Sequence, residues 1–135
     1  MFYSSTLSFF LLFPIFFNFE SLATERKEAK IVCLPTQTKL QFDCDISLKV
    51  KKTDKPVESA IFSVGADMPS MPGAHNVKPV TAKPKDKAGR YSVLIQLEMF
   101  GEWILKLNIS KPTRDIIVKK LYFSNKGGKP LKHLH

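Results

Sequence analysis

The sequence predicts an all-β protein, specifically an immunoglobulin-like antiparallel β-sandwich of about seven strands. Apolar and polar residues alternate along several short runs, which is typical of strands with one buried and one solvated face. Turn-forming residues separate these runs about every ten residues, a spacing typical of a sandwich. No run places its apolar residues at the spacing of an amphipathic helix. We therefore expect one domain built from two packed sheets.

The clearest strand is the run LQFDCDISLKV, residues 40–50. Every second side chain from Leu40 to Val50 is apolar or a cysteine, and the side chains between them are polar or charged. A strand with this pattern buries one face and exposes the other. Cys44 belongs to the buried face, where a disulfide would be shielded from solvent.

Cys33 and Cys44 are the only two cysteines in the chain. Their separation suits two neighbouring strands joined by a turn around residues 35–39. An even pair of cysteines in an exported chain favours a structural disulfide, which would contribute ~3 kcal/mol by closing a short loop. The alternative is a two-thiolate metal site, but the spacing is unlike that of the common zinc motifs.

The next two segments differ in regularity. Residues 57–68 alternate again, with Met68 at the end of the run. Residues 76–89 carry prolines and turn residues, and a proline cannot donate a hydrogen bond to a sheet ladder. We therefore expect an edge strand or an irregular connection over residues 76–89.

Residues 90–99 and 103–109 form two matched alternating runs, with the turn Phe100-Gly101-Glu102 between them. This arrangement predicts a β-hairpin in which Trp103 is the largest inward side chain. Residues 115–123 predict the last strand. Residues 125–135 contain glycine, proline and charge without periodicity, so we expect a mobile tail.

The N-terminal residues 1–23 predict a secretory signal peptide. They contain no Lys or Arg, are rich in Phe and Leu, and end in Ser21-Leu22-Ala23, a small-x-small cleavage pattern. The alternative is an uncleaved anchor in the inner membrane, but the apolar run is shorter than the ~20 residues that a spanning helix needs. Cleavage after Ala23 leaves a domain over residues 24–124 and the tail, and predicts that the protein is exported.

The formal net charge is +9. The lysines are scattered along the chain, and lysines on strand edges and turns keep sheets from pairing with one another. The alternative interpretation is that the positive charge binds an acidic partner or an anionic membrane surface. Because the chain is predicted to be exported, we do not expect the positive charge to bind nucleic acid.

The stretch MPSMPGAH, residues 68–75, is the most distinctive local motif. Proline after both Met68 and Met71 favours extended backbone, in which side chains three positions apart point the same way. Thioether sulfur favours Cu(I), and the imidazole of His75 is an acceptable further ligand. Met99, which lies one hairpin away from this motif, is a candidate additional ligand if the loop folds over that end of the sandwich. The competing interpretation is that Met68 continues the inward face of its strand and fills the core.

Other sites receive less support from the sequence. His133 and His135 lie in the predicted tail, where a preorganised metal site is uncommon. The chain has no serine elbow, no Gly-rich phosphate loop and no zinc-protease signature, so we expect no enzyme activity. Phe100 lies at a predicted hairpin tip with no core to fill, and an exposed aromatic side chain suits contact with another protein.

Three motifs together resemble the YtkA-like/FixH-like family of exported bacterial domains. They are Met68-Pro69-Ser70-Met71, then Gly89-Arg90-Tyr91, then Met99-Phe100-Gly101-Glu102-Trp103. The resemblance implies a small periplasmic β-sandwich, found alone or beside metal-efflux and cytochrome-oxidase-assembly components, with copper handling as a suggested role.

Two functions follow as expectations. The first is a non-enzymatic periplasmic accessory domain that binds a partner protein, such as a metal-efflux or oxidase-assembly component, through residues 68–75 and Phe100. The second is a Cu(I) metallochaperone that uses Met68, Met71 and His75, with Met99 as a further candidate. Weak contact with an anionic membrane surface is a third use of the basic surface.

Overall fold

A computed structural model of the protein describes residues 25–131. These residues form nine strands and no helix, so the all-β prediction is confirmed. The predicted signal peptide lies outside the described residues, as do His133 and His135. Within residues 25–131, no helix is long and apolar enough to cross a membrane. The strands are β1 (Lys27–Pro35), β2 (Gln41–Val50), β3 (Ile61–Asp67), β4 (Asn76–Thr81), β5 (Lys83–Pro84), β6 (Arg90–Gln96), β7 (Gly101–Lys111), β8 (Asp115–Ser124) and β9 (Gly127–Pro130).

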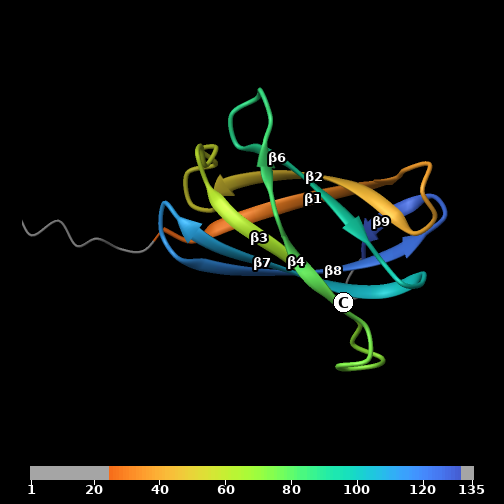
Figure 1. The fold of residues 1–135 in the computed structure, drawn as a ribbon. Helices are drawn as coiled ribbons and strands as arrows, with labels where there is room; N and C mark the ends of the chain where they lie inside the picture. Colours follow the sequence, from red (N-terminus) through yellow and green to blue (C-terminus); the bar gives the residue numbers. More distant parts are fainter. Residues whose placement is uncertain (1–24, 132–135) are drawn as a thin grey trace, which may run out of the picture.

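The strands form one antiparallel hydrogen-bonded sheet in the order β4-β3-β7-β8-β9-β1-β2-β6-β5. The sheet folds over on itself, so that β3, β7 and β8 lie across the core from β1, β2 and β6 (Figure 1). The result is the expected two-layered body, but its layers are joined through the short strand β9. The structure has nine strands where about seven were expected. The two additional strands, β5 and β9, are too short to show an alternating pattern in the sequence.

The alternation in the sequence correctly predicts most of the side chains that enter the core, although Met99, expected to face inward at the end of its run, is exposed. On β2, Phe42, Cys44, Ile46 and Leu48 are all buried. Trp103 on β7 is completely buried, as expected for the largest core side chain. Its indole Nε1 donates a hydrogen bond to the Met99 carbonyl over 3.1 Å, which satisfies the one polar atom of the ring.

The predicted hairpin between residues 90–99 and 103–109 is wrong. β6 pairs with β2 and β5, whereas β7 pairs with β3 and β8. Residues 97–100 therefore cross from one layer to the other. Alternation identifies the buried face of a strand but does not identify the neighbouring strand. β6 and β7 therefore bury the expected faces, although they do not pair with each other.

The proline-containing segment 76–89 occupies the sheet edges, as expected. β4 and β5 are the two outermost strands of the sheet. Pro79 and Pro84 lie in these edge strands, where a missing N–H costs no ladder hydrogen bond.

The start of the predicted mobile tail is instead a strand. Residues 127–130 form β9, which pairs with β8 and, at Gly128, with Cys33 of β1. A Cβ atom on Gly128 would lie 2.4 Å from the Phe123 ring, and one on Gly127 would lie 2.4 Å from the Cys33 carbonyl oxygen. The two glycines are therefore required for β9 to pass this close to its neighbours.

The predicted disulfide joins Cys33 of β1 to Cys44 of β2. The two residues are direct partners in the antiparallel ladder, with Cα atoms 4.0 Å apart. Both side chains are buried. The bridge therefore holds together two neighbouring strands of one layer and is shielded from solvent.

Candidate functional site

Met68 directly follows β3 and lies in the core. Its side chain is only 3% exposed, which continues the inward alternation of the strand. Its methyl carbon Cε lies 3.1 Å from the position that a Cβ atom on Gly101 would take, at the start of β7. This packing agrees with the interpretation that Met68 fills the core. It makes the sulfur inaccessible to a ligand at the surface.

The loop between β3 and β4 folds through successive turns. The Met71 N–H donates to the Met68 carbonyl over 3.1 Å, and the Ala74 N–H donates to the Met71 carbonyl over 3.2 Å. Gly73 adopts φ +77°, which favours glycine. The expected extended backbone would have pointed Met68 and Met71 the same way, but Met68 is buried and Met71 is exposed. This loop protrudes from the body beyond the ends of β3 and β4 (Figure 1).

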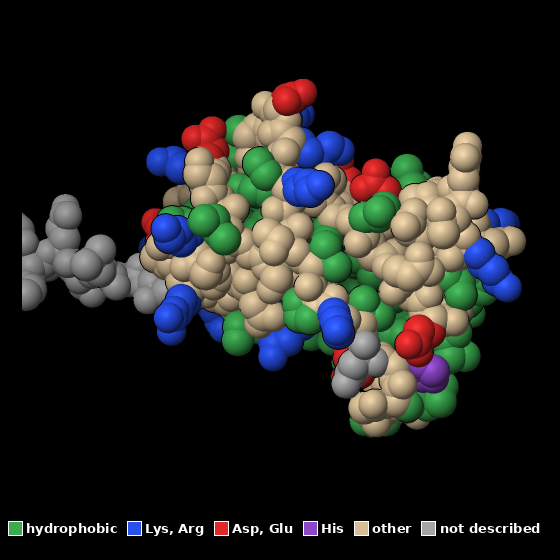
Figure 2. Space-filling model, viewed as in Figure 1, with side chains coloured by type: hydrophobic (Ala, Val, Ile, Leu, Met, Phe, Trp, Pro, Cys, Tyr) green, Lys and Arg blue, Asp and Glu red, His purple; other side chains and the backbone are tan. Residues whose placement is uncertain are grey.

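His75 connects this loop to the crossing segment 97–100. Its Nδ1 contacts the Glu98 carboxylate, which lies just after β6. Figure 2 shows the histidine and an acidic side chain together at the base of the protruding loop. Two segments far apart in the sequence therefore form one end of the molecule.

Met99 and Phe100 complete this end. Their side chains are 38% and 43% exposed, although the Met99 carbonyl is held by the Trp103 indole. The backbone is thus anchored to the core while both side chains face solvent. We define the loop rim as Met71, His75, Glu98, Met99 and Phe100.

The metal ligands predicted from the sequence are only partly brought together. Met68 would have to leave the core to join Met71 and His75, so the three do not form one ready-made site. Among the residues described, no group of three or more His, Cys, Asp and Glu side chains has metal-site geometry. The remaining soft-metal donors at this end are the thioethers of Met71 and Met99 and the Nε2 nitrogen of His75.

The structure also contains a polar cluster around Asp45 that was not predicted from the sequence. Asp45 on β2 accepts hydrogen bonds from Lys85 Nζ at 2.6 Å and from Arg90 Nε at 2.8 Å. Partial burial raises the pKa of the Asp45 carboxyl, but the hydrogen bonds and charges of Lys85 and Arg90 outweigh this and lower it below the ordinary value. Because the two cations flank the turn between β5 and β6, the cluster fixes that turn to the sheet.

These features define a small disulfide-bonded β domain with one exposed loop rim. A family model described as YtkA-like matches residues 27–108, and the chain therefore belongs to the YtkA-like family. The match covers the strands from β1 to most of β7, including the whole loop rim. Neither a curated protein nor a solved structure matches the chain.

Proposed function

We propose that this protein is a non-enzymatic accessory domain that works in the periplasm and binds a partner protein through the loop rim. The observation that carries the proposal is the contact between His75 and Glu98, which joins two separate segments into one surface. Membership of the YtkA-like family and the signal-like N-terminus support the assignment to the periplasm.

The composition of the loop rim supports binding to a protein. Met71, Met99 and Phe100 are large apolar side chains that remain exposed beside a well-packed core. Aromatic side chains and methionine are enriched at protein interfaces, and an anchored backbone reduces the entropy lost on binding. Glu98 and His75 add polar groups that can fix the orientation of a partner.

The test is site-specific photo-crosslinking in cells that produce the full chain. A photo-reactive residue at Phe100 is expected to yield an adduct of one defined mass. The control position is Leu94, an exposed side chain on β6 outside the loop rim. Equal adducts from both positions, or none from Phe100, would overturn the proposal.

A second candidate function is Cu(I) binding at the same end. The supporting observation is that the exposed thioethers of Met71 and Met99 lie on the two segments joined by His75 and Glu98. Thioether and imidazole ligands suit Cu(I). Met68 is excluded from this ligand set as long as it stays in the core.

Anaerobic Cu(I) titration against a chromophoric chelator separates the two functions. If copper is the ligand, Met71→Leu together with Met99→Leu abolishes binding of one ion per chain, whereas Met68→Leu leaves it unchanged. Chelator competition that is identical in the wild-type protein and the double variant would remove the copper function and leave the partner-binding proposal intact.

A further inference from the structure

The outward side chains of β7, β8 and β9 form a surface in which apolar residues lie next to lysines. Directly opposite residues of an antiparallel pair point to the same side of the sheet. Three such pairs each join one apolar side chain to one lysine: Val118 and Lys106, Ile104 and Lys120, Tyr122 and Lys129. We define the β8 face as these six residues.

The apolar side chains of the β8 face are accessible from outside the molecule. Val118 is 56% exposed and Tyr122 is 50% exposed, and Ile116, the next outward residue along β8, is 60% exposed. β7 and β8 belong to the layer that lies across the core from β1 and β2, and the β8 face is on the outer side of that layer (Figure 1). Among residues 25–131, no strand packs on this outer side.

The lysines of the β8 face are only partly neutralised. The outward charged residues of β7, β8 and β9 are three lysines and one carboxylate: Lys106, Lys120, Lys129 and Glu102. Glu102 forms an ion pair with Lys120. Lys106 and Lys129 are exposed, and neither pairs with a carboxylate within residues 25–131. The β8 face therefore combines exposed apolar side chains with uncompensated positive charge.

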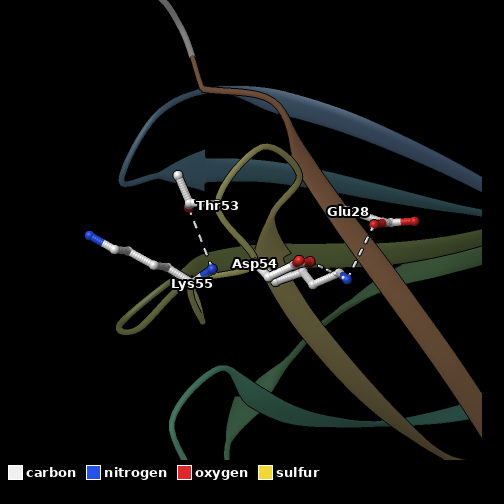
Figure 3. A network of polar contacts seen from close by, with 5 residues as sticks. Glu28, Thr53, Asp54 and Lys55 are labelled. Carbon is white, nitrogen blue, oxygen red and sulfur yellow. Dashed lines mark hydrogen bonds and ion pairs between the residues drawn. The ribbon is translucent and has the colours of Figure 1, made fainter.

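The outer side of the other layer has a different charge balance. The outward charged residues of β1, β2 and β6 are three carboxylates and three cations: Glu28, Asp43, Asp45, Lys30, Lys49 and Arg90. Lys49 contacts both Glu28 and Asp54 (Figure 3). The exposed Val32 on this side lies opposite Asp45, a carboxylate, whereas Val118 lies opposite a lysine. The uncompensated positive charge is therefore a property of one side of the sandwich.

The composition of the β8 face fits a lipid surface better than a protein surface. Its cations are all lysines, and lysine is depleted at protein interfaces whereas arginine is enriched there. A lysine side chain lies with its apolar stem along a hydrophobic surface while its ammonium group reaches a polar one. Tyrosine is enriched where a bilayer meets water. A second copy docked face to face would bring the lysines of both copies together, which is unfavourable.

We propose that the β8 face docks the domain onto the surface of a bilayer that contains anionic phospholipids. The lysine ammonium groups contact the lipid phosphates, and the apolar side chains lie at the level of the headgroups. The positive charge gives the preference for anionic over zwitterionic lipid. The β8 face contains no residue of the loop rim, so the inference stands independently of the proposed function.

The test is co-sedimentation of the protein, purified after export, with lipid vesicles. The vesicles contain equal parts of phosphatidylglycerol and phosphatidylcholine, and the control vesicles contain phosphatidylcholine alone. We expect tighter binding to the anionic vesicles, and loss of this preference at about 1 M salt, where the Debye length is ~3 Å. Intact mass ensures that all variants compared have the same N-terminus.

Two pairs of lysine substitutions make the test specific to the β8 face. Lys106→Gln together with Lys129→Gln is expected to weaken binding about 25-fold, because each lysine near an anionic bilayer contributes about fivefold. Lys30→Gln together with Lys87→Gln changes the net charge equally at exposed positions outside the face. This control is expected to weaken binding less than about threefold, because distant charges are screened. Trp103 fluorescence checks that every variant is folded.

Paramagnetic broadening identifies the side of the domain that contacts lipid. Val118 and Val32 are a matched pair, since both are exposed valines on outward faces of opposite layers. Nitroxide-labelled lipid in anionic bicelles is expected to broaden the NMR signal of the Val118 amide far more than that of the Val32 amide.

Three results would overturn the proposal. Equal weakening by the two pairs of lysine substitutions would show that net charge alone attracts the protein to lipid. Equal broadening at Val118 and Val32 would show that no particular face docks. Absence of any preference for the anionic vesicles would exclude a lipid surface and leave an acidic protein as the occupant of the β8 face.

Discussion

The methyl group of Met68 occupies the space beside Gly101 that any larger residue at that position would need. A Cβ atom on Gly101 would lie 3.1 Å from Met68 Cε, and Gly101 also adopts φ +134°, a region that L side chains rarely enter. Met68 and Gly101 therefore form a packed contact between the end of β3 and the start of β7. The two methionines of the motif consequently have different roles, since Met71 is exposed.

Truncation of the two methionines should separate these roles. Met68→Ala removes a buried side chain and leaves a cavity, so we expect the free energy of unfolding to fall by ~2–4 kcal/mol. Met71→Ala is the matched control at an exposed position and should change it by less than ~0.5 kcal/mol. Urea denaturation followed by Trp103 fluorescence measures both. Equal losses in the two variants would contradict the buried packing of Met68.

The buried faces of the strands were predictable from the sequence because alternation determines them directly. Residues 42–48 and 103–109 both point the expected side chains inward. The partners of these strands were not predictable, since a strand of given pattern can pair with any neighbour that buries the same face. The crossing at residues 97–100 is thus a tertiary feature without a local signal.

The candidate site was predictable only in part. The motif at residues 68–75 and the exposure of Phe100 were identified from local sequence alone. The contact of His75 with Glu98 was not, because it depends on how two distant segments meet. The strand β9 was missed for a different reason, since Gly127 and Gly128 resemble a flexible linker in sequence but are needed here to avoid steric overlap.

Substitution of Gly128 tests this interpretation of β9. Gly128→Ala places a Cβ atom 2.4 Å from the Phe123 ring, which is buried and cannot move freely, so we expect a loss of ~2–3 kcal/mol in unfolding free energy. Gly65→Ala on β3 is the matched control, because its new Cβ atom would meet nothing closer than 3.6 Å. Thermal unfolding measures both variants. A Gly128→Ala protein as stable as Gly65→Ala would show that β9 is not packed against β8 as described.

Tyr91 should contribute to stability through its hydroxyl group as well as its ring. The hydroxyl donates to the Val57 carbonyl over 2.6 Å and accepts from the Ala60 N–H over 2.9 Å, which ties the segment before β3 to β6. Tyr91→Phe leaves both backbone groups without this partner in a buried setting, so we expect a loss of ~1–3 kcal/mol. Tyr122→Phe is the control, because Tyr122 is half exposed on β8.

The same Tyr91 variant has a local readout. Hydrogen exchange at the Ala60 amide is expected to accelerate in Tyr91→Phe and to stay unchanged in Tyr122→Phe. Unchanged exchange at Ala60 in both variants would show that the hydroxyl does not hold this segment.

Asp45 should make the stability of the protein depend on pH in the acid range. Its carboxyl pKa is lowered in the folded state, because the opposing effect of partial burial is outweighed by the hydrogen bonds and charges of Lys85 and Arg90. The pKa of this carboxyl in the unfolded chain is about 3.8, and its pKa in the folded protein is lower. The ionised carboxyl therefore stabilises the fold when the pH is above about 3.8. The stabilisation is then lost as the pH falls through the folded pKa.

Asp45→Asn removes this contribution. At neutral pH we expect a loss of ~1 kcal/mol, a modest value because the ion pairs are partly exposed to solvent. Below pH ~4 the difference between the variant and the wild type should shrink, because the wild-type carboxyl is protonated first in the unfolded protein and then, at its lower folded pKa, in the folded protein. Asp43→Asn is the matched control, an exposed carboxylate on the same face of β2. Urea denaturation across this pH range measures all three proteins, and a constant difference between Asp45→Asn and wild type at every pH would contradict the role of the ionised carboxylate.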